Sequence, residues 1–167
     1  YFMKITFFRL FLLSLYFFVN CLISGTDIRI PFELWPKVEE KISDVTILVA
    51  KTEQLSHQGF CGATSEQFQT TVIWFPDIKE ETVFVNTNPG YGTVNQDLQV
   101  VFLNKNWLVL DIKTMEKHTG TAVAPRGTFS ALEGIPDVIR KLGFKKNKPS
   151  PFRIQKIGNR YFGIKHQ

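Results

Sequence analysis

Residues 98–112, LQVVFLNKNWLVLDI, contain two runs of large apolar side chains separated by the polar link Asn104-Lys105-Asn106. β-branched and other large apolar residues favour strands, and a short polar link between two such runs is typical of a hairpin. The stretch therefore predicts strands at 98–103 and 107–112 that pair in the antiparallel direction.

Two similar apolar runs precede this hairpin, at residues 70–75 and 82–85. Pro76-Asp77 ends the first run, and the turn-forming sequence NPGYG at 88–92 follows the second. We therefore expect two more strands in the same antiparallel sheet.

Near the end of the chain, residues 152–157, FRIQKI, and 160–165, RYFGIK, mix apolar and polar side chains on either side of Gly158-Asn159. A Gly-Asn pair between two such runs is typical of a tight two-residue turn. This segment predicts a second β-hairpin.

Two segments have the three- and four-residue spacing of an amphipathic helix. The first begins at Pro36, although its β-branched run 45–49 is equally consistent with a buried strand. The second begins at Ser130, with Glu133 as its capping-box partner, and Gly143 ends it.

Pro136 lies inside this second segment and would break a helix that began at Ser130. In the alternative interpretation, the regular helix covers only residues 136–142, with proline in its first turn. We predict for residues 26–167 a single α+β domain with a mostly antiparallel sheet and two helices packed on one face.

The first 25 residues have the three-part pattern of a secretory signal. Lys4 and Arg9 precede the apolar run Leu10–Val19, and the small residues Ser24 and Gly25 follow. This run is shorter than the roughly 20 residues that span a bilayer. We therefore expect an exported protein, extracellular or periplasmic.

Three fates of this segment remain open: cleavage, lipid attachment at Cys21, or retention of residues 10–23 as a membrane anchor. Cys21 and Cys61 are the two cysteines of the chain. Because cleavage or lipidation would remove or modify Cys21, we expect no disulfide between them.

Charge is unevenly distributed along the chain. Residues 26–136 carry 9 Lys and Arg against 14 Asp and Glu, a balance of −5, whereas residues 137–167 carry 9 basic residues against Asp137 alone, a balance of +8. Such asymmetry favours contact with an anionic partner, although solvated faces of a helix and a hairpin would give the same pattern.

We place the contact region in this basic C-terminal segment. Its candidate binding residues are Lys145, Lys146, Lys148, Arg153, Lys156 and Arg160. The expected partner is a protein or an anionic membrane or envelope surface, and we expect no nucleic acid because an exported protein seldom meets it. The first functional hypothesis is therefore a non-enzymatic exported binding module, of open oligomeric state.

The second hypothesis is a small thiol hydrolase. Cys61 would be its nucleophile, Gln58 would help to hold an oxyanion, and His118 would serve as the base, oriented by Asp111 or Asn106. A structural thiol is the alternative for Cys61, because free cysteine usually behaves as a small hydrophobe.

Residues 58–65, QGFCGATS, resemble the papain-type pattern Q-G-x-C-G-S-C-W over about eight residues. In that register Thr64 occupies the place of the nucleophile, and no tryptophan follows. The resemblance therefore does not imply a papain-like activity for Cys61.

We expect no metal site and no cofactor. Apart from the pair His57-x-x-x-Cys61, the histidines His57, His118 and His166 have no metal-ligand spacing with Cys61, and two ligands do not make a zinc site. The glycine-rich stretch 88–92 has no Lys followed by Ser or Thr, as a phosphate-binding loop would require.

Overall fold

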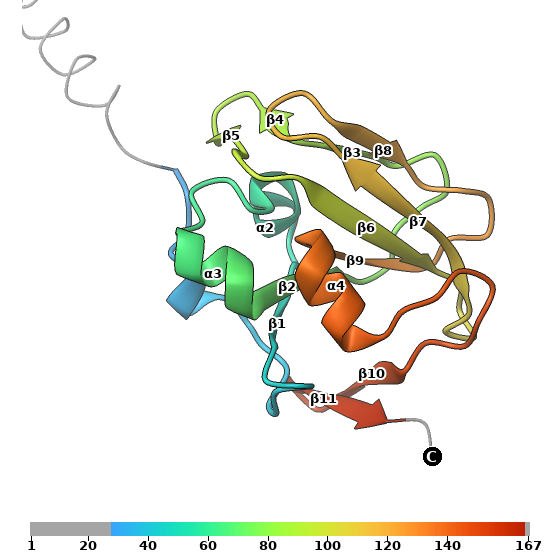
Figure 1. The fold of residues 1–167 in the computed structure, drawn as a ribbon. Coiled ribbons are helices and arrows are strands. Elements are labelled where there is room, and N and C mark those ends of the chain that lie inside the picture. The colour runs from blue at the N-terminus through green and yellow to red at the C-terminus, as the bar shows by residue number, and fades with distance from the viewer. Residues whose placement is uncertain (1–27, 166–167) are drawn as a thin grey trace, which may run out of the picture.

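A computed structural model describes residues 28–165 and forms an α+β domain in which antiparallel pairing predominates (Figure 1). The expected signal at 1–25, with Cys21 and the possible anchor 10–23, lies outside the described residues. Within residues 28–165, no helix has both the length and the apolar character needed to cross a membrane.

The main sheet has five strands in the order β1-β2-β9-β6-β7. These are β1 (Thr46–Val49), β2 (Thr71–Phe75), β9 (Ser130–Gly134), β6 (Leu98–Leu103) and β7 (Val109–Met115). β1 runs parallel to β2, and the other three pairs are antiparallel. The predicted pairing of the strands around 98–103 and 107–112 is confirmed, with β7 starting and ending slightly later.

β9 is the middle strand of this sheet. Every residue of β2 and of β9 is buried, as are five of the six residues of β6. Strands that are buried on both faces place all their side chains in the core, whichever way each one points. A polar side chain on β9 is therefore an interior group, and Glu133 is one.

Three two-stranded ribbons complete the fold, and one of them holds the strand expected at 82–85, which therefore does not join the main sheet as we predicted. They are β3 (Val83–Val85) with β8 (Thr121–Val123), β4 (Thr87–Asn88) with β5 (Gly92–Thr93), and β10 (Phe152–Ile157) with β11 (Arg160–Lys165). The predicted C-terminal hairpin is confirmed, with Ile157 paired to Arg160 across the turn. It lies at one end of the molecule, below the main sheet in Figure 1.

The helices are short. Besides the 3-10 turn η1 (Phe32–Leu34), the described residues contain α2 (Glu53–Gln58), α3 (Ser65–Thr70) and α4 (Pro136–Leu142). Thr52 and Thr64 accept N-terminal backbone hydrogen bonds with their side chains, and Thr64 forms a capping box with Gln67. Gly143 ends α4 with φ 83°, a conformation that glycine adopts without steric cost.

The helix expected from Pro36 is absent, and that prediction is wrong. Ser43 and Asp44 have positive φ, which turns the chain so that Ile42 and Val45 hydrogen-bond to each other. The alternative strand in the run 45–49 is confirmed as β1, because that segment pairs with β2. Pairing with a neighbouring strand here overrides the helical spacing.

The helix expected from Ser130 is also wrong, because residues 130–134 form β9. This segment pairs with β2 on one side and β6 on the other, so that Glu133 lies opposite both Ile73 and Val100. The alternative helix 136–142 is confirmed as α4. With α2 and α3 not predicted, three short helices replace the two that we expected on one face.

Candidate functional site

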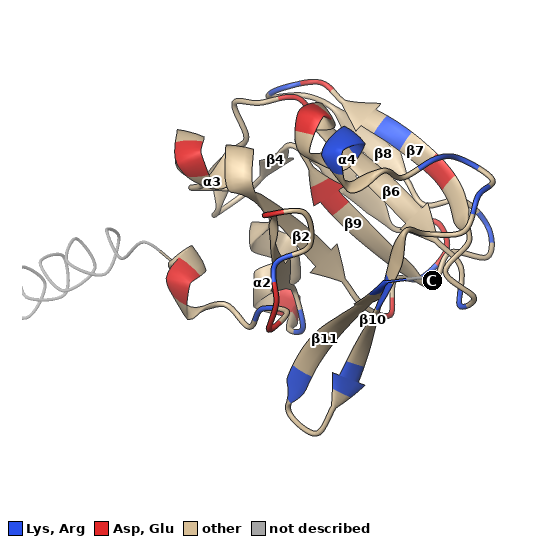
Figure 2. Cartoon of the chain, turned by 60° about the horizontal axis from the view of Figure 1, so that its bottom comes forward, with Lys and Arg blue, Asp and Glu red and all other residues tan. Residues whose placement is uncertain are grey.

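The C-terminal hairpin presents cationic and apolar side chains on its outward face. Arg153 pairs with Ile164, and Ile157 pairs with Arg160. Side chains of directly paired residues lie on the same face of a ribbon. In Figure 2 this hairpin extends away from the rest of the molecule and carries basic residues on both strands.

The opposite face of the hairpin holds it to the domain. Phe152, Ile154 and Tyr161 are buried. The Tyr161 ring lies edge-on to Trp74 with 5.9 Å between the ring centroids, and the Glu39 N–H donates to the Tyr161 carbonyl at 2.9 Å. The outward-facing side chains therefore belong to a hairpin that is held in place by packing against the rest of the domain.

Arg160 is engaged by an acidic side chain of the domain. Its Nε and Nη2 donate to the two carboxylate oxygens of Glu39 at 2.7 and 2.8 Å. This two-point contact lowers the pKa of Glu39 and raises the pKa of Arg160. Arg160 thus joins the hairpin to the segment before β1, and its charge is largely balanced.

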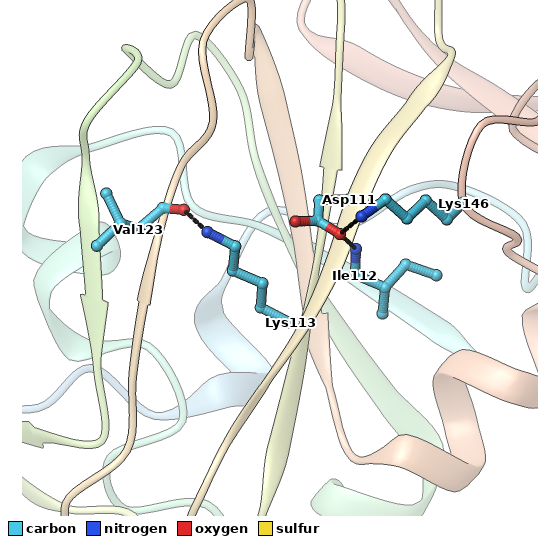
Figure 3. Close-up of polar contacts among 5 residues, drawn as sticks. All are labelled: Asp111, Ile112, Lys113, Val123 and Lys146. Carbon is cyan, nitrogen blue, oxygen red and sulfur yellow. Dashed lines mark hydrogen bonds and ion pairs between the residues drawn. The ribbon is translucent and has the colours of Figure 1, made fainter.

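Lys146 is held in a similar way (Figure 3). Its Nζ lies 2.8 Å from Asp111 Oδ1, which also accepts from the Ile112 N–H at 3.0 Å. Burial alone would raise the pKa of Asp111, but these two hydrogen bonds and the nearby cations lower it overall. On the same strand, Lys113 Nζ donates to the Val123 carbonyl at 2.7 Å.

Four of the six predicted binding residues are exposed and form no ion pair with any residue of 28–165. They are Lys145, Lys148, Arg153 and Lys156, and we call them the cationic surface. The sequence alone does not distinguish these four from Lys146 and Arg160, because the acidic partners of Lys146 and Arg160 lie far away along the chain.

Cys61 lies in the link between α2 and α3 and is 2% exposed. Its Sγ lies 3.4 Å from the Gly92 carbonyl oxygen. Burial raises the pKa of the thiol, and the Glu133 carboxylate raises it further, while Arg29 acts weakly in the opposite direction. A thiol nucleophile needs a lowered pKa, so this environment keeps Cys61 in its unreactive form.

The residues proposed to assist Cys61 are not assembled around it. Gln58 lies beside Cys61, but its side-chain amide binds the N–H and the carbonyl of Ile30 at 2.7 and 2.9 Å. His118, Asp111 and Asn106 line neither of the two hollows that Cys61 borders in the described part of the chain.

Glu133 was not predicted as a site residue, yet it has the most unusual environment among the described residues. Its side chain is buried, and Oε2 has no hydrogen-bond partner within residues 28–165. Burial raises the pKa of Glu133 to about 8. A buried polar atom without a partner costs free energy and points to a bound water or ligand.

Glu133 and Cys61 border the same small cavity of about 80 Å³ between α2, β3 and β9. Its other lining residues are Ser56, His57, Gln58, Gly59, Phe60, Phe75, Val83, Phe84, Val85, Asn88 and Val94. We call this space the Glu133 cavity. The sequence signal for it was weak: a single acid within the otherwise apolar or small run 129–135, FSALEGI.

A loop covers the Cys61 side of the cavity. The Asn88 side-chain amide donates to the His57 carbonyl at 2.8 Å, and Gly92 accepts from Cys61, so both ends of the 88–92 turn are held against α2 and the link that follows it. Within residues 28–165, the cavity included, no group of three or more His, Cys, Asp or Glu side chains is arranged to hold a metal ion.

We predict that folded protein reacts slowly at Cys61. Because the thiol is buried and its pKa is raised, alkylation by iodoacetamide at pH 7 should be at least about tenfold slower than in urea-unfolded protein. Peptide mass mapping distinguishes modification of Cys61 from that of Cys21. Rapid alkylation of Cys61 at mildly acidic pH would instead demonstrate an activated thiolate.

Comparisons with known proteins give little further information. No protein-family model matches the chain, and no curated protein matches it either. A protein of unknown function from Novosphingobium aromaticivorans is similar in structure, at 16% identity and a TM-score of 0.48, with 75% of this chain and 97% of that chain covered. A protein from Sinorhizobium meliloti, provisionally described as a transcription regulator, is similar at 15% identity and a TM-score of 0.49, with 71% and 81% covered.

Proposed function

We propose that this chain is an exported, non-enzymatic binding module that attaches to an anionic envelope surface through its C-terminal region. The observation that carries the proposal is the cationic surface: Lys145, Lys148, Arg153 and Lys156 are exposed, and no acidic side chain of the described chain neutralises them. Charges that are balanced within a protein attract a partner weakly, whereas unbalanced ones attract anions over about a Debye length.

Exposed apolar side chains beside these cations favour a lipid headgroup surface over an acidic protein. Ile157, at the hairpin turn, is 56% exposed and lies on the same face of the hairpin as Arg153, whereas Lys156 lies on the other face. Phe162 and Ile164 are half-buried on the outward face of β11. Basic side chains next to exposed apolar ones are typical of surfaces that lie in the interfacial region of a membrane.

The proposal is tested by exchanging all four cations for acids. The variant K145E/K148E/R153E/K156E, in residues 26–167, should bind vesicles containing phosphatidylglycerol at least about a hundredfold more weakly, since each basic residue contributes about 1 kcal/mol near an anionic membrane. Binding of the unchanged protein should also weaken steeply as salt is raised. Co-sedimentation with the vesicles measures both effects.

A matched control keeps the change in net charge but moves it elsewhere. The variant K51E/K79E/K105E/K117E reverses four exposed lysines outside the C-terminal region and should retain most of the binding. Equal loss in both variants would mean that only net charge matters and would contradict a defined surface. Equal binding to phosphatidylcholine vesicles, or none to either, would exclude an anionic lipid surface and leave an acidic protein as the partner.

The surroundings of Cys61 do not favour a thiol hydrolase. The buried Cys61 has a raised pKa, and Gln58 is committed to backbone hydrogen bonds. No observation within residues 28–165 favours hydrolysis over binding.

A further inference from the structure

We propose that the Glu133 cavity binds a small organic ammonium group, with the Glu133 carboxylate as its counter-ion. The inference is independent of the cationic surface, which it does not involve. It rests on a buried carboxylate that faces this space, on the apolar and aromatic walls of the space, and on the absence of a lysine or arginine side chain among the described residues that line it.

The carboxylate is aimed into the cavity and is not used by the fold. Glu133 lies on the central strand β9, where its backbone pairs with β2 and β6. Its Oε2 has no partner among the described residues, and Gly59 leaves open space beside it, since a Cβ at residue 59 would lie 3.5 Å from that oxygen. A structural glutamate would be expected to bind an N–H or a basic side chain.

The walls of the cavity suit an organic cation. Phe60, Phe75 and Phe84 line it together with three valines. Aromatic rings attract cations through their electron-rich faces, and apolar walls accommodate the methyl or methylene groups of an alkylammonium ion. An anionic ligand would have no lysine or arginine partner here among the described lining residues, and it would be repelled whenever Glu133 is ionised.

The cavity is sized for a small group and has an exposed rim. Its volume of about 80 Å³ exceeds the space that one water needs and is far below that of a typical drug-sized site. His57, Val83 and Val85 line it and are exposed, whereas Phe60, Cys61 and Glu133 are buried. An ammonium group would therefore enter past α2 and β3 and reach the carboxylate at the inner end.

Binding of a cation to Glu133 must be coupled to loss of a proton. With a pKa of about 8, roughly a tenth of the Glu133 side chains are ionised at pH 7 and about nine tenths at pH 9. The affinity for a permanent cation should therefore rise about tenfold between these pH values. Two other titratable groups line this space, His57 of α2 and Cys61, and Arg29 lies near Cys61. Within the described chain, β2, β3 and β6 contribute no titratable side chain to the lining.

The experiment titrates the full chain with tetramethylammonium and with methylammonium, and follows backbone amide and Glu carboxyl NMR signals. We expect millimolar binding, the affinity open to ligands of so few atoms, with shifts confined to the lining residues. We also expect the tenfold gain from pH 7 to pH 9. The variant Glu133→Gln should abolish binding while leaving the fold intact, because an amide replaces a neutral acid of similar shape.

The controls separate charge from apolar filling. Glu40→Gln removes an exposed carboxylate and should leave binding unchanged. tert-Butanol, a neutral molecule of similar size, should bind much more weakly than tetramethylammonium. Equal binding of tert-butanol, survival of cation binding in Glu133→Gln, or the absence of any shift with either cation would each overturn the proposal.

Two sources of the ammonium group are distinguished by two further probes. Butylammonium represents a free amine, and Nα-acetyl-lysine amide represents a lysine side chain of a polypeptide. Similar affinities mean that the cavity accepts the end of a lysine side chain, whereas binding of butylammonium alone means a free amine. Failure of both, where methylammonium binds, would limit the cavity to the smallest amines and still support ammonium binding.

Discussion

The variant Glu133→Gln is expected to be more stable than the unchanged protein at pH 8 and above, by about 5 kcal/mol. Burial raises the pKa of Glu133 from an ordinary 4.5 to about 8, so the folded protein keeps a proton that the unfolded chain releases. Folding is unaffected by this difference below pH 4.5. Between pH 4.5 and 8, stability falls by about 1.4 kcal/mol per pH unit.

Glutamine carries no ionisable proton, so the variant should lose this pH dependence. Urea unfolding at pH 5, 6, 7 and 8 measures it, since the two proteins should be similar near pH 5 and diverge as the pH rises. Glu40→Gln, which removes an exposed carboxylate, should follow the unchanged protein at every pH. Parallel stability curves for Glu133→Gln and the unchanged protein would contradict a buried, unpartnered acid.

A residue that lowers stability at neutral pH calls for a compensating role. A loss of about 5 kcal/mol is large for a domain of this size, because the free energy of unfolding of such a domain is typically about 5–15 kcal/mol in total. An ammonium ion that binds only the ionised, folded form would restore part of the loss by mass action. The stability curve and the cation titration therefore report on the same carboxylate by independent measurements.

Strands with strong local signals could be predicted from the sequence. The runs around 98–103 and 152–165 combine β-branched residues with clear turn residues, and both formed as expected. The segments 36–49 and 130–142 have helical spacing instead, and only their pairing with distant strands decides the outcome. For Ile47 and Glu133, that partner is β2, which no local pattern identifies.

The candidate sites were predictable to different degrees. The basic segment was visible in the charge count. The ion pairs of Lys146 with Asp111 and of Arg160 with Glu39 were not predictable, because the partners lie 35 and 121 residues apart in the chain. Cys61 was identified as a chemically distinctive residue, whereas its neighbour in the cavity was not. One acid in an apolar strand has no spacing that would distinguish it from a surface residue.

Gly120→Ala is expected to destabilise the protein by about 3 kcal/mol or more. A Cβ at residue 120 would lie 2.2 Å from the Glu116 backbone N and 2.4 Å from the Glu116 carbonyl O. Backbone atoms of a tight turn cannot move aside as the end of a side chain can, so the cost should reach or exceed the upper end of the range for overpacking. The turn 116–120 also accepts the N–H and side-chain amide of the buried Asn86.

Loosening this turn should also affect the Glu133 cavity. The His118 N–H donates to the Val94 carbonyl at 2.9 Å, and Val94 lines the cavity just beyond the 88–92 loop that covers Cys61. Gly120→Ala should therefore speed the alkylation of Cys61 under native conditions, besides lowering the urea midpoint followed by tryptophan fluorescence. This result would show that the 116–120 turn helps to hold the 88–92 loop in place over the Cys61 thiol.

Gly158→Ala is the matched control for this substitution. It also exchanges glycine for alanine in a turn, but its Cβ would meet nothing within 4 Å, and its φ of +60° lies in the left-handed region that alanine adopts at a cost of about 1–2 kcal/mol. Its alkylation rate at Cys61 should match that of the unchanged protein, because the C-terminal hairpin makes no contact with the 88–92 loop among the hydrogen bonds of the described chain. Destabilisation by Gly120→Ala no larger than that by Gly158→Ala would contradict a severe clash with Glu116, because Gly120 itself does not have a positive φ.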